Sequence, residues 1–171
     1  LSDIPGNEAS VVTIGNFDGM HNGHKKVIST CIERAHKLGV DAVAITFDPH
    51  PIQVHKPEVG LQLISPLRDR LDAMAAAGLD ATLVAHYDAS VYSLEADEFV
   101  YEYLVERCGA REVVVCEDFR FGRGNAGTID TLRELGRRYG FNVITVTDIE
   151  APEGRRWSSS WVRELLAAVN V

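Results

Sequence analysis

The chain has 171 residues, of which 46% are hydrophobic and 25% charged, a length and balance typical of one globular domain with a sizeable core. A formal net charge of −8 argues against nonspecific nucleic-acid binding, and no apolar run is long enough to span a bilayer. Three scattered cysteines, Cys31, Cys108 and Cys116, form no CxxC pair, so we expect free thiols and a cytoplasmic location.

Apolar runs rich in β-branched residues alternate with segments of helical periodicity along the whole chain. The runs predict strands at 11–17, 41–47, 81–87, 112–119 and 142–147. The periodic segments predict helices at 24–39, 65–78, 97–109, 128–140 and 158–169. This alternation predicts an α/β fold, a doubly wound, Rossmann-like, five-stranded parallel sheet with helices on both faces. Ligands of such sheets bind beyond the carboxyl ends of the strands, near the switch in strand order.

Several helix ends carry recognisable signals. We expect Ser65 to cap the second helix, with Pro66 at its first position. The fourth helix should begin at Thr128 and stop at Gly140. The third helix should bury one face, made of Phe99, Val100, Tyr103 and Leu104.

The stretch GNFDGMHNGH follows the first predicted strand and leads into the first predicted helix. Gly15 and Gly19 allow tight bends, and Gly23 removes a side chain beside the helix start. Unpaired N–H groups at that helix start favour an anion, and His21 and His24 add side-chain donors directed toward the same point. The stretch therefore predicts a phosphate site built without the lysine of a P-loop.

Two other interpretations of the histidines stay open at this point. They could ligate a metal with His50 and His55, but helical zinc pairs usually lie four residues apart and need a third ligand. They could also be surface side chains on a glycine-rich turn. Other unusual clusters fall where this fold places its site, so we favour the phosphate interpretation and expect no metal held by protein side chains alone.

The motif resembles the HxGH signature of the nucleotidyltransferase superfamily. Its longer form, with FDG ahead of the histidines, is similar to the adenylyltransferase module of bacterial bifunctional riboflavin kinase/FAD synthetases, and the resemblance covers essentially the whole chain. It implies that ATP and FMN are the substrates, that FAD and pyrophosphate are the products, and that Mg²⁺ accompanies ATP. The ATP-binding residues that we expect are Gly15, Asn16, Phe17, Asp18, Gly19, Gly23 and Arg163.

In this chemistry the FMN phosphate is itself the nucleophile, so direct in-line attack on the ATP α-phosphate needs no covalent intermediate. That agrees with a sequence that shows no convincing Ser–His–Asp or Cys–His arrangement. We expect His21 and His24 to stabilise the α-phosphate and the leaving group. Asp18 is expected to orient the motif loop rather than bind the metal.

The stretch TFDPHP follows the second predicted strand. Its two prolines stiffen the loop around His50, so Asp48 and His50 should be held in place. Standing alone, the motif would indicate only a rigid turn capped by Asp48. The resemblance implies that the loop lines the flavin and nucleotide cleft, with Asp48, His50 and Pro51 as flavin-binding residues.

The stretch CEDFRFGRG follows the fourth predicted strand. Its period-two pattern puts the rings of Phe119 and Phe121 on one face, which suits a flat heteroaromatic ligand, although both rings could equally belong to the core. The resemblance implies that Asp118, Phe119, Phe121 and Gly122 shape the flavin pocket. Cys116 departs from the family, which often has glycine there.

The stretch RRWSSSWVRE places hydroxyls at the start of the last predicted helix. A serine there could simply cap that helix. The stretch resembles the family's R-x-S-S-T-x-x-R motif, which implies contacts with the β- and γ-phosphates of ATP. The residues concerned are Arg156, Ser159, Ser160 (which replaces the threonine) and Arg163. Two helix starts that both present phosphate donors predict a polyphosphate between them.

Family members usually continue into a riboflavin kinase domain. We interpret residues 1–171 as the FMN adenylyltransferase domain, and because the sequence stops at Val171 we expect no riboflavin phosphorylation by it. One alternative function is a sister nucleotidyltransferase that acts on another phosphorylated acceptor. Another is a noncatalytic flavin- or nucleotide-binding module.

Overall fold

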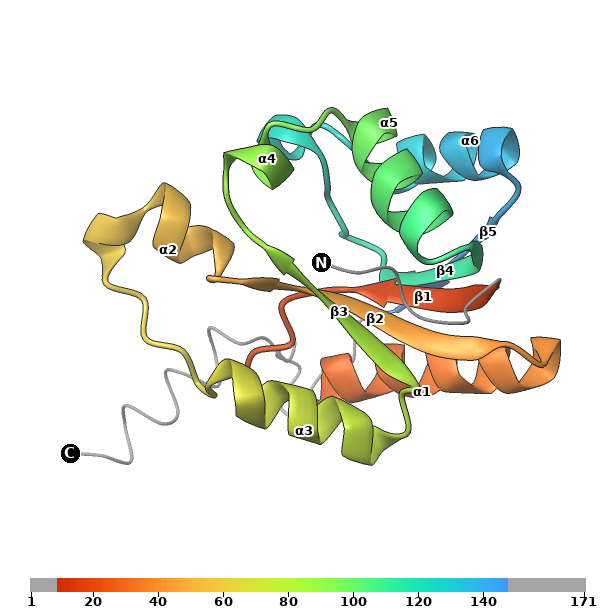
Figure 1. The fold of residues 1–171 in the computed structure, drawn as a ribbon, viewed down its shortest axis with the longest axis horizontal. Coiled ribbons are helices and arrows are strands. Elements are labelled where there is room, and N and C mark those ends of the chain that lie inside the picture. The colour runs from red at the N-terminus through yellow and green to blue at the C-terminus, as the bar shows by residue number, and fades with distance from the viewer. Residues whose placement is uncertain (1–8, 148–171) are drawn as a thin grey trace.

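A computed structural model of the chain describes residues 9–147 (Figure 1). Its sheet has five strands, β1 Ser10–Ile14, β2 Asp41–Asp48, β3 Ala81–His86, β4 Ala110–Cys116 and β5 Asn142–Val146. All pairings are parallel and the order is β3-β2-β1-β4-β5. The chain builds outward from β1 to β3 and then returns to add β4 on the other side of β1. The predicted parallel sheet is confirmed, with its switch point between β1 and β4.

Helices cover both faces of the sheet (Figure 1). One face carries α1 (Asn22–Leu38) and α3 (Leu67–Ala77). The other carries α5 (Ala96–Phe99), its π-helical continuation η2 (Val100–Arg107), and α6 (Ile129–Tyr139). The remaining short elements are α2 Pro51–His55, α4 Ala89–Tyr92, and the 3₁₀ turns η1 Pro57–Val59 and η3 Arg123–Asn125. None of the helices within residues 9–147 is long and apolar enough to cross a membrane.

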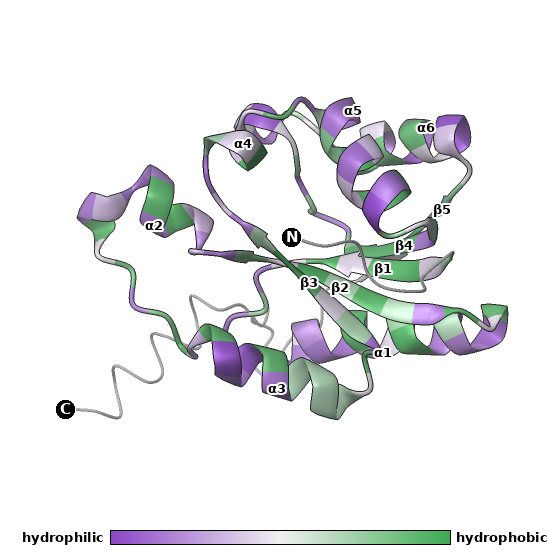
Figure 2. Cartoon of the chain, viewed as in Figure 1, coloured by the Kyte–Doolittle hydropathy of each residue, from purple (hydrophilic) through white to green (hydrophobic). Residues whose placement is uncertain are grey.

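The two faces bury separate hydrophobic clusters because alternate strand residues point to opposite sides. On β1, Val11 packs with the α1 cluster and Val12 with the η2 and α6 cluster, and both are fully buried. Figure 2 shows the strands as largely hydrophobic and the outer sides of the helices as hydrophilic. The doubly wound arrangement predicted from near-continuous apolar runs follows from this double burial.

Most predicted helix ends are confirmed. Thr128 caps α6 and Gly140 ends it, and the four residues expected to be buried in the third helix are all buried. The prediction for Ser65 is wrong, because Pro66 occupies the N-cap position of α3 and Ser65 is engaged elsewhere. The sequence also missed α2 and α4, whose four or five residues are too few for a helical period to show. The predicted helix at 158–169 lies outside the described residues.

Candidate active site

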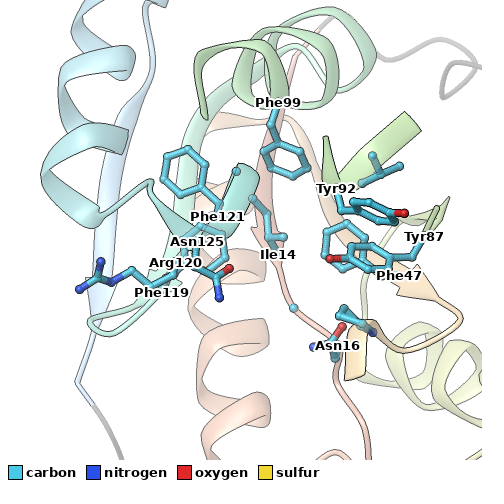
Figure 3. A pocket seen from close by; sticks show the side chains of 14 residues that line it. Ile14, Asn16, Phe47, Tyr87, Tyr92, Phe99, Phe119, Arg120, Phe121 and Asn125 are labelled. Carbon is cyan, nitrogen blue, oxygen red and sulfur yellow. The ribbon is translucent and has the colours of Figure 1, made fainter. Parts of the chain in front are cut away.

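The carboxyl ends of β1 to β4 enclose a pocket of about 320 Å³ at the switch point (Figure 3). Phe119 and Phe121 lie on one side of it, and Tyr87 and Tyr92 lie on the other (Figure 3). Ile14 and Asn16, from the end of β1 and the residues after it, lie between the two walls. Six of its fourteen lining residues are aromatic, which suits a flat heteroaromatic ligand.

The wall that follows β4 has the geometry expected from the sequence. The rings of Phe119 and Phe121 are nearly parallel, at 12° with centroids 5.6 Å apart, so the predicted common face is confirmed. Phe121 exchanges two backbone hydrogen bonds with Gly127, which closes the loop. Gly122 has φ +76°, and a Cβ there would lie 2.8 Å from the Cα of Ala96, so only glycine fits without displacing α5.

The opposite wall was not expected from the sequence. The Tyr87 hydroxyl lies 2.7 Å from Nε2 of His55, and the His55 ring packs edge-on against Tyr92 at 4.9 Å. Phe47, near the end of β2, packs edge-on against Tyr87 at 5.7 Å. A signal was available, because Phe47 and Tyr87 lie at the carboxyl ends of two predicted parallel strands, where ligands of this fold bind.

The two motif histidines lie at the start of α1. His21 is the N-cap residue, and its Nδ1 accepts hydrogen bonds from the backbone N–H groups of Gly23 (3.0 Å) and His24 (3.3 Å). The rings of His21 and His24 stack at 3.7 Å. The helix donors that we expected to face a phosphate are therefore occupied by an imidazole. With Nδ1 as acceptor, a neutral His21 carries its proton on Nε2.

His24 is held in its neutral form. The pKa of His24 is lowered from 6.5 to about 3, mainly by burial and secondly by the neighbouring His21, while Asp18 opposes the shift. Its Nδ1 is buried and has no hydrogen-bond partner among the described residues. Phe17, itself buried, packs edge-on against the His24 ring at 5.4 Å. His24 therefore offers imidazole hydrogen bonds rather than fixed positive charge.

Asp18 orients the loop, as the sequence led us to expect. Its carboxylate is buried and accepts hydrogen bonds from the backbone N–H groups of Ile64 (3.0 Å) and Ser65 (3.0 Å). Gly19, at φ +81°, donates its N–H to Ser65 Oγ. Asp18 thus ties the motif loop to the segment that precedes α3.

The remaining predicted residues are placed as follows. Pro51 lines the pocket, whereas His50 is nearly buried and uses Nδ1 to cap α2 at the N–H of Ile52. Asp48, at the end of β2, is partly exposed and does not line the pocket.

Asp118 lies in an adjacent hollow at the start of α6, which shares Phe119 and Arg120 with the pocket. Arg156, Ser159, Ser160 and Arg163 lie outside the described residues.

Sequence reasoning missed Arg70, which is fully buried on α3. Its Nη1 donates to the backbone carbonyl of Asn16 at 2.6 Å and to Thr46 Oγ1 at 3.4 Å. The sequence did contain a signal, because Arg70 lies three residues after Leu67 and four before Met74, on the apolar face of the predicted helix. A charged residue at such a position needs buried partners.

The three cysteines are free thiols, as the sequence predicts. Cys31 and Cys108 are fully buried, and burial raises the pKa of each thiol to about 12, so both are unreactive. Cys116 is only partly buried, at the end of β4.

Residues 3–161 match the family model for FAD synthetase. The chain belongs to the FAD synthetase family. A Geobacillus thermodenitrificans protein, provisionally named a bifunctional riboflavin kinase/FMN adenylyltransferase, is 38% identical over 95% of this chain and 84% of its own length. The bifunctional riboflavin kinase/FMN adenylyltransferase of Escherichia coli K12 is 34% identical over the whole chain and 54% of its own length. The family resemblance of the motif is confirmed, and the chain spans about half the length of several such bifunctional relatives.

Among solved structures, the chain is similar to a Streptococcus pneumoniae protein named a macrolide-efflux protein. The TM-score is 0.79 at 27% identity, over 94% of this chain and 52% of that one. The fold of this FAD synthetase family member is therefore found in about half of that longer chain.

Acid should destabilise the fold through His24. Its pKa is about 3 when folded and near 6.5 when unfolded, so below pH 6.5 only the unfolded state takes up the proton. The contribution of His24 is complete above pH 6.5 and is lost as the pH falls, which amounts to about 2 kcal/mol between pH 7 and pH 5. Urea unfolding at both pH values of wild type and His24→Gln measures it, and the variant should lack this part of the pH dependence.

The control is His36→Gln, an exposed histidine at the other end of α1. It should keep the wild-type difference between pH 7 and pH 5. An unchanged difference in His24→Gln would mean that His24 is not held neutral by the fold.

Proposed function

We propose that this chain transfers the adenylyl group of ATP to the phosphate of FMN, giving FAD and pyrophosphate. The observation that carries the proposal is that one continuous loop lines an aromatic pocket at one end and carries two stacked histidines at the other. Asn16 lies in an aromatic pocket, and five residues later His21 begins a stacked histidine pair at a helix start. Membership of the FAD synthetase family supports the same reaction.

In this proposal the pocket holds the isoalloxazine ring. Phe119, Phe121, Tyr87 and Tyr92 surround a space suited to a flat ring system, and the exposed Arg120 at its edge adds positive charge. The phosphate of FMN then attacks the α-phosphate of ATP directly. Such positioning of two reactants can supply on the order of 7–11 kcal/mol of the barrier.

We assign the reacting phosphates to the motif histidines. A neutral imidazole donates one hydrogen bond without carrying charge, and a preorganised donor on the transition state contributes about 3–4 kcal/mol. An anionic triphosphate beside His24 raises the pKa of His24, so that the binding of ATP favours the protonated ring. Arg156, Ser159, Ser160 and Arg163 would hold the outer phosphates, as the family motif implies.

We propose that Mg²⁺ enters with ATP. Within residues 9–147 no group of three His, Cys, Asp or Glu side chains is arranged to hold a metal ion. Ligands supplied by phosphate oxygens and water suit Mg²⁺, which keeps much of its hydration when it binds with a nucleotide. When bound, the ion neutralises charge that develops on the phosphates.

The proposal is tested by incubating the protein with Mg²⁺, ATP and FMN and separating the products by chromatography. FAD and pyrophosphate should appear in equal amounts. Parallel reactions replace FMN with pantetheine phosphate, nicotinamide mononucleotide or glycerol phosphate. Turnover of one of these in place of FMN would identify a sister nucleotidyltransferase, and no turnover at all would identify a binding module.

His24→Ala should lower kcat for FAD formation at least tenfold, because a donor at the reacting phosphates is lost. FMN binding, followed by quenching of flavin fluorescence, should change little. His36→Ala on the same helix is the control and should keep wild-type kcat. Wild-type turnover by His24→Ala would remove this histidine from the mechanism.

Phe119→Leu should raise KM for FMN about two- to tenfold, because leucine keeps apolar bulk but loses an aromatic contact of about 0.5–1.5 kcal/mol. KM for ATP should stay constant. Tyr101→Leu, an exposed aromatic residue on η2 away from the pocket, is the control. A rise in KM for ATP rather than FMN would assign this wall to the nucleotide.

A further inference from the structure

Several buried polar atoms that lack a hydrogen-bond partner lie in or beside the β1–α1 loop. Within the described part of the chain, six buried side-chain nitrogen or oxygen atoms lack a hydrogen-bond partner. Four of these atoms belong to three residues, Asn16, His24 and Arg70. Unpartnered buried groups are costly, and a fold keeps them where another requirement outweighs the cost. Asn16 and His24 belong to the proposed site, whereas Arg70 lies on α3 and lines no part of the pocket.

The Arg70 guanidinium lies where three chain segments meet. Nη1 donates to the carbonyl of Asn16, in the β1–α1 loop, and to the hydroxyl of Thr46, in β2. Nη2 lies 4.0 Å from Oδ1 of Asp48, at the end of β2. Thr46 also donates its hydroxyl proton to the same Asn16 carbonyl, at 3.3 Å. The planar Arg70 guanidinium thus links the end of β2 to the first turn of the motif loop.

Two sets of hydrogen bonds hold the β1–α1 loop against α3, one made by a side chain of the loop and the other by a side chain of α3. Asp18 reaches from the loop to backbone N–H groups just before α3, and Arg70 reaches from α3 to a backbone carbonyl of the loop. Both side chains are almost completely buried. The loop that carries the motif histidines therefore cannot shift relative to α3 without breaking a charge-assisted hydrogen bond at one end or the other.

We propose that Arg70 is a positioning residue for adenylyl transfer: it fixes the β1–α1 loop at Asn16, so that the His21–His24 pair at the other end of the loop keeps the geometry that the reacting phosphates require. The inference rests on the proposed function. Arg70 touches no substrate, since its side chain is fully buried. A lysine would keep the charge but has no fork to serve Asn16 and Asp48 together, so it replaces arginine only in part.

The test compares four variants at a temperature where circular dichroism shows each to be folded. Arg70→Met removes the donors at similar volume, and Arg70→Lys keeps the charge. Met74→Ala is the matched control for packing, because Met74 is fully buried one turn farther along α3, in the same hydrophobic cluster as Phe17 of the loop, and makes no part of the hydrogen bonds that Arg70 gives to the loop. Arg68→Met is the matched control for charge, because Arg68 is exposed on the same helix. Steady-state kcat and the FMN dissociation constant are measured for all four.

Arg70→Met should lose about tenfold or more in kcat, because small misplacements of reacting groups are costly. Its FMN dissociation constant should stay within about threefold of wild type, since Arg70 does not hold the aromatic walls that bind the ring. Arg70→Lys should fall between Arg70→Met and wild type. Arg68→Met should keep kcat within about twofold of wild type, as exposed residues away from the site do. Met74→Ala should lose clearly less kcat than Arg70→Met, because it leaves the hydrogen bond from Arg70 to Asn16 in place.

Wild-type kcat in Arg70→Met, or an equal loss in Met74→Ala, would overturn the inference by leaving Arg70 a merely structural role. Should Arg70→Met not fold, Arg70→Lys decides, and a wild-type kcat there has the same meaning. An inactive wild type would instead contradict the proposed function. The rise in melting temperature on adding ATP then tests the positioning role, which predicts a smaller rise in Arg70→Met than in Met74→Ala.

Discussion

Two buried charges of opposite sign hold the loop between β1 and α1, and the rest of the site depends on that loop. Asp18 and Arg70 each bond to main-chain groups rather than to each other, so they fix the path of the backbone. The loop needs this support, since Phe17 and Met20 adopt positive φ angles of 51° and 41°. Each such residue costs about 1–3 kcal/mol, and hydrogen bonds to charged groups, at about 1.5–3 kcal/mol each, are of the size that offsets it.

The fixed loop contributes to two different binding surfaces within a few residues, an aromatic pocket and a helix start that carries histidines. Its first residues lie in a pocket walled by aromatic side chains from the ends of β2, β3 and β4. Its last residues form the helix start with the stacked histidines. An apolar ring and a reacting phosphate group of one substrate can therefore be held by a single loop, which suits a transfer reaction that depends mainly on positioning.

The electrostatics of the site are local. A chain of net charge −8 does not attract phosphates through its overall field, so the proposed reaction depends on short-range donors to bind them. We propose the histidines for this role, because burial keeps His24 neutral in the free protein and an arriving anion would favour its protonation. A neutral His24 also avoids the repulsion that two stacked imidazolium cations would suffer.

The sequence by itself determined the parallel α/β sheet, the face that each long helix buries, and the histidine motif at the first helix start. These follow from local periodicity, from capping residues such as Thr128, and from the right-handed crossover rule, none of which needs distant contacts. Only the tertiary structure decided which side chains meet at the ends of different strands. Tyr87, Tyr92 and Phe119 line one pocket, and Arg70 reaches Asn16 across 54 positions. Pairings over such separations depend on how the strands are ordered and how the helices pack on them, and a single sequence carries no periodic signal for either.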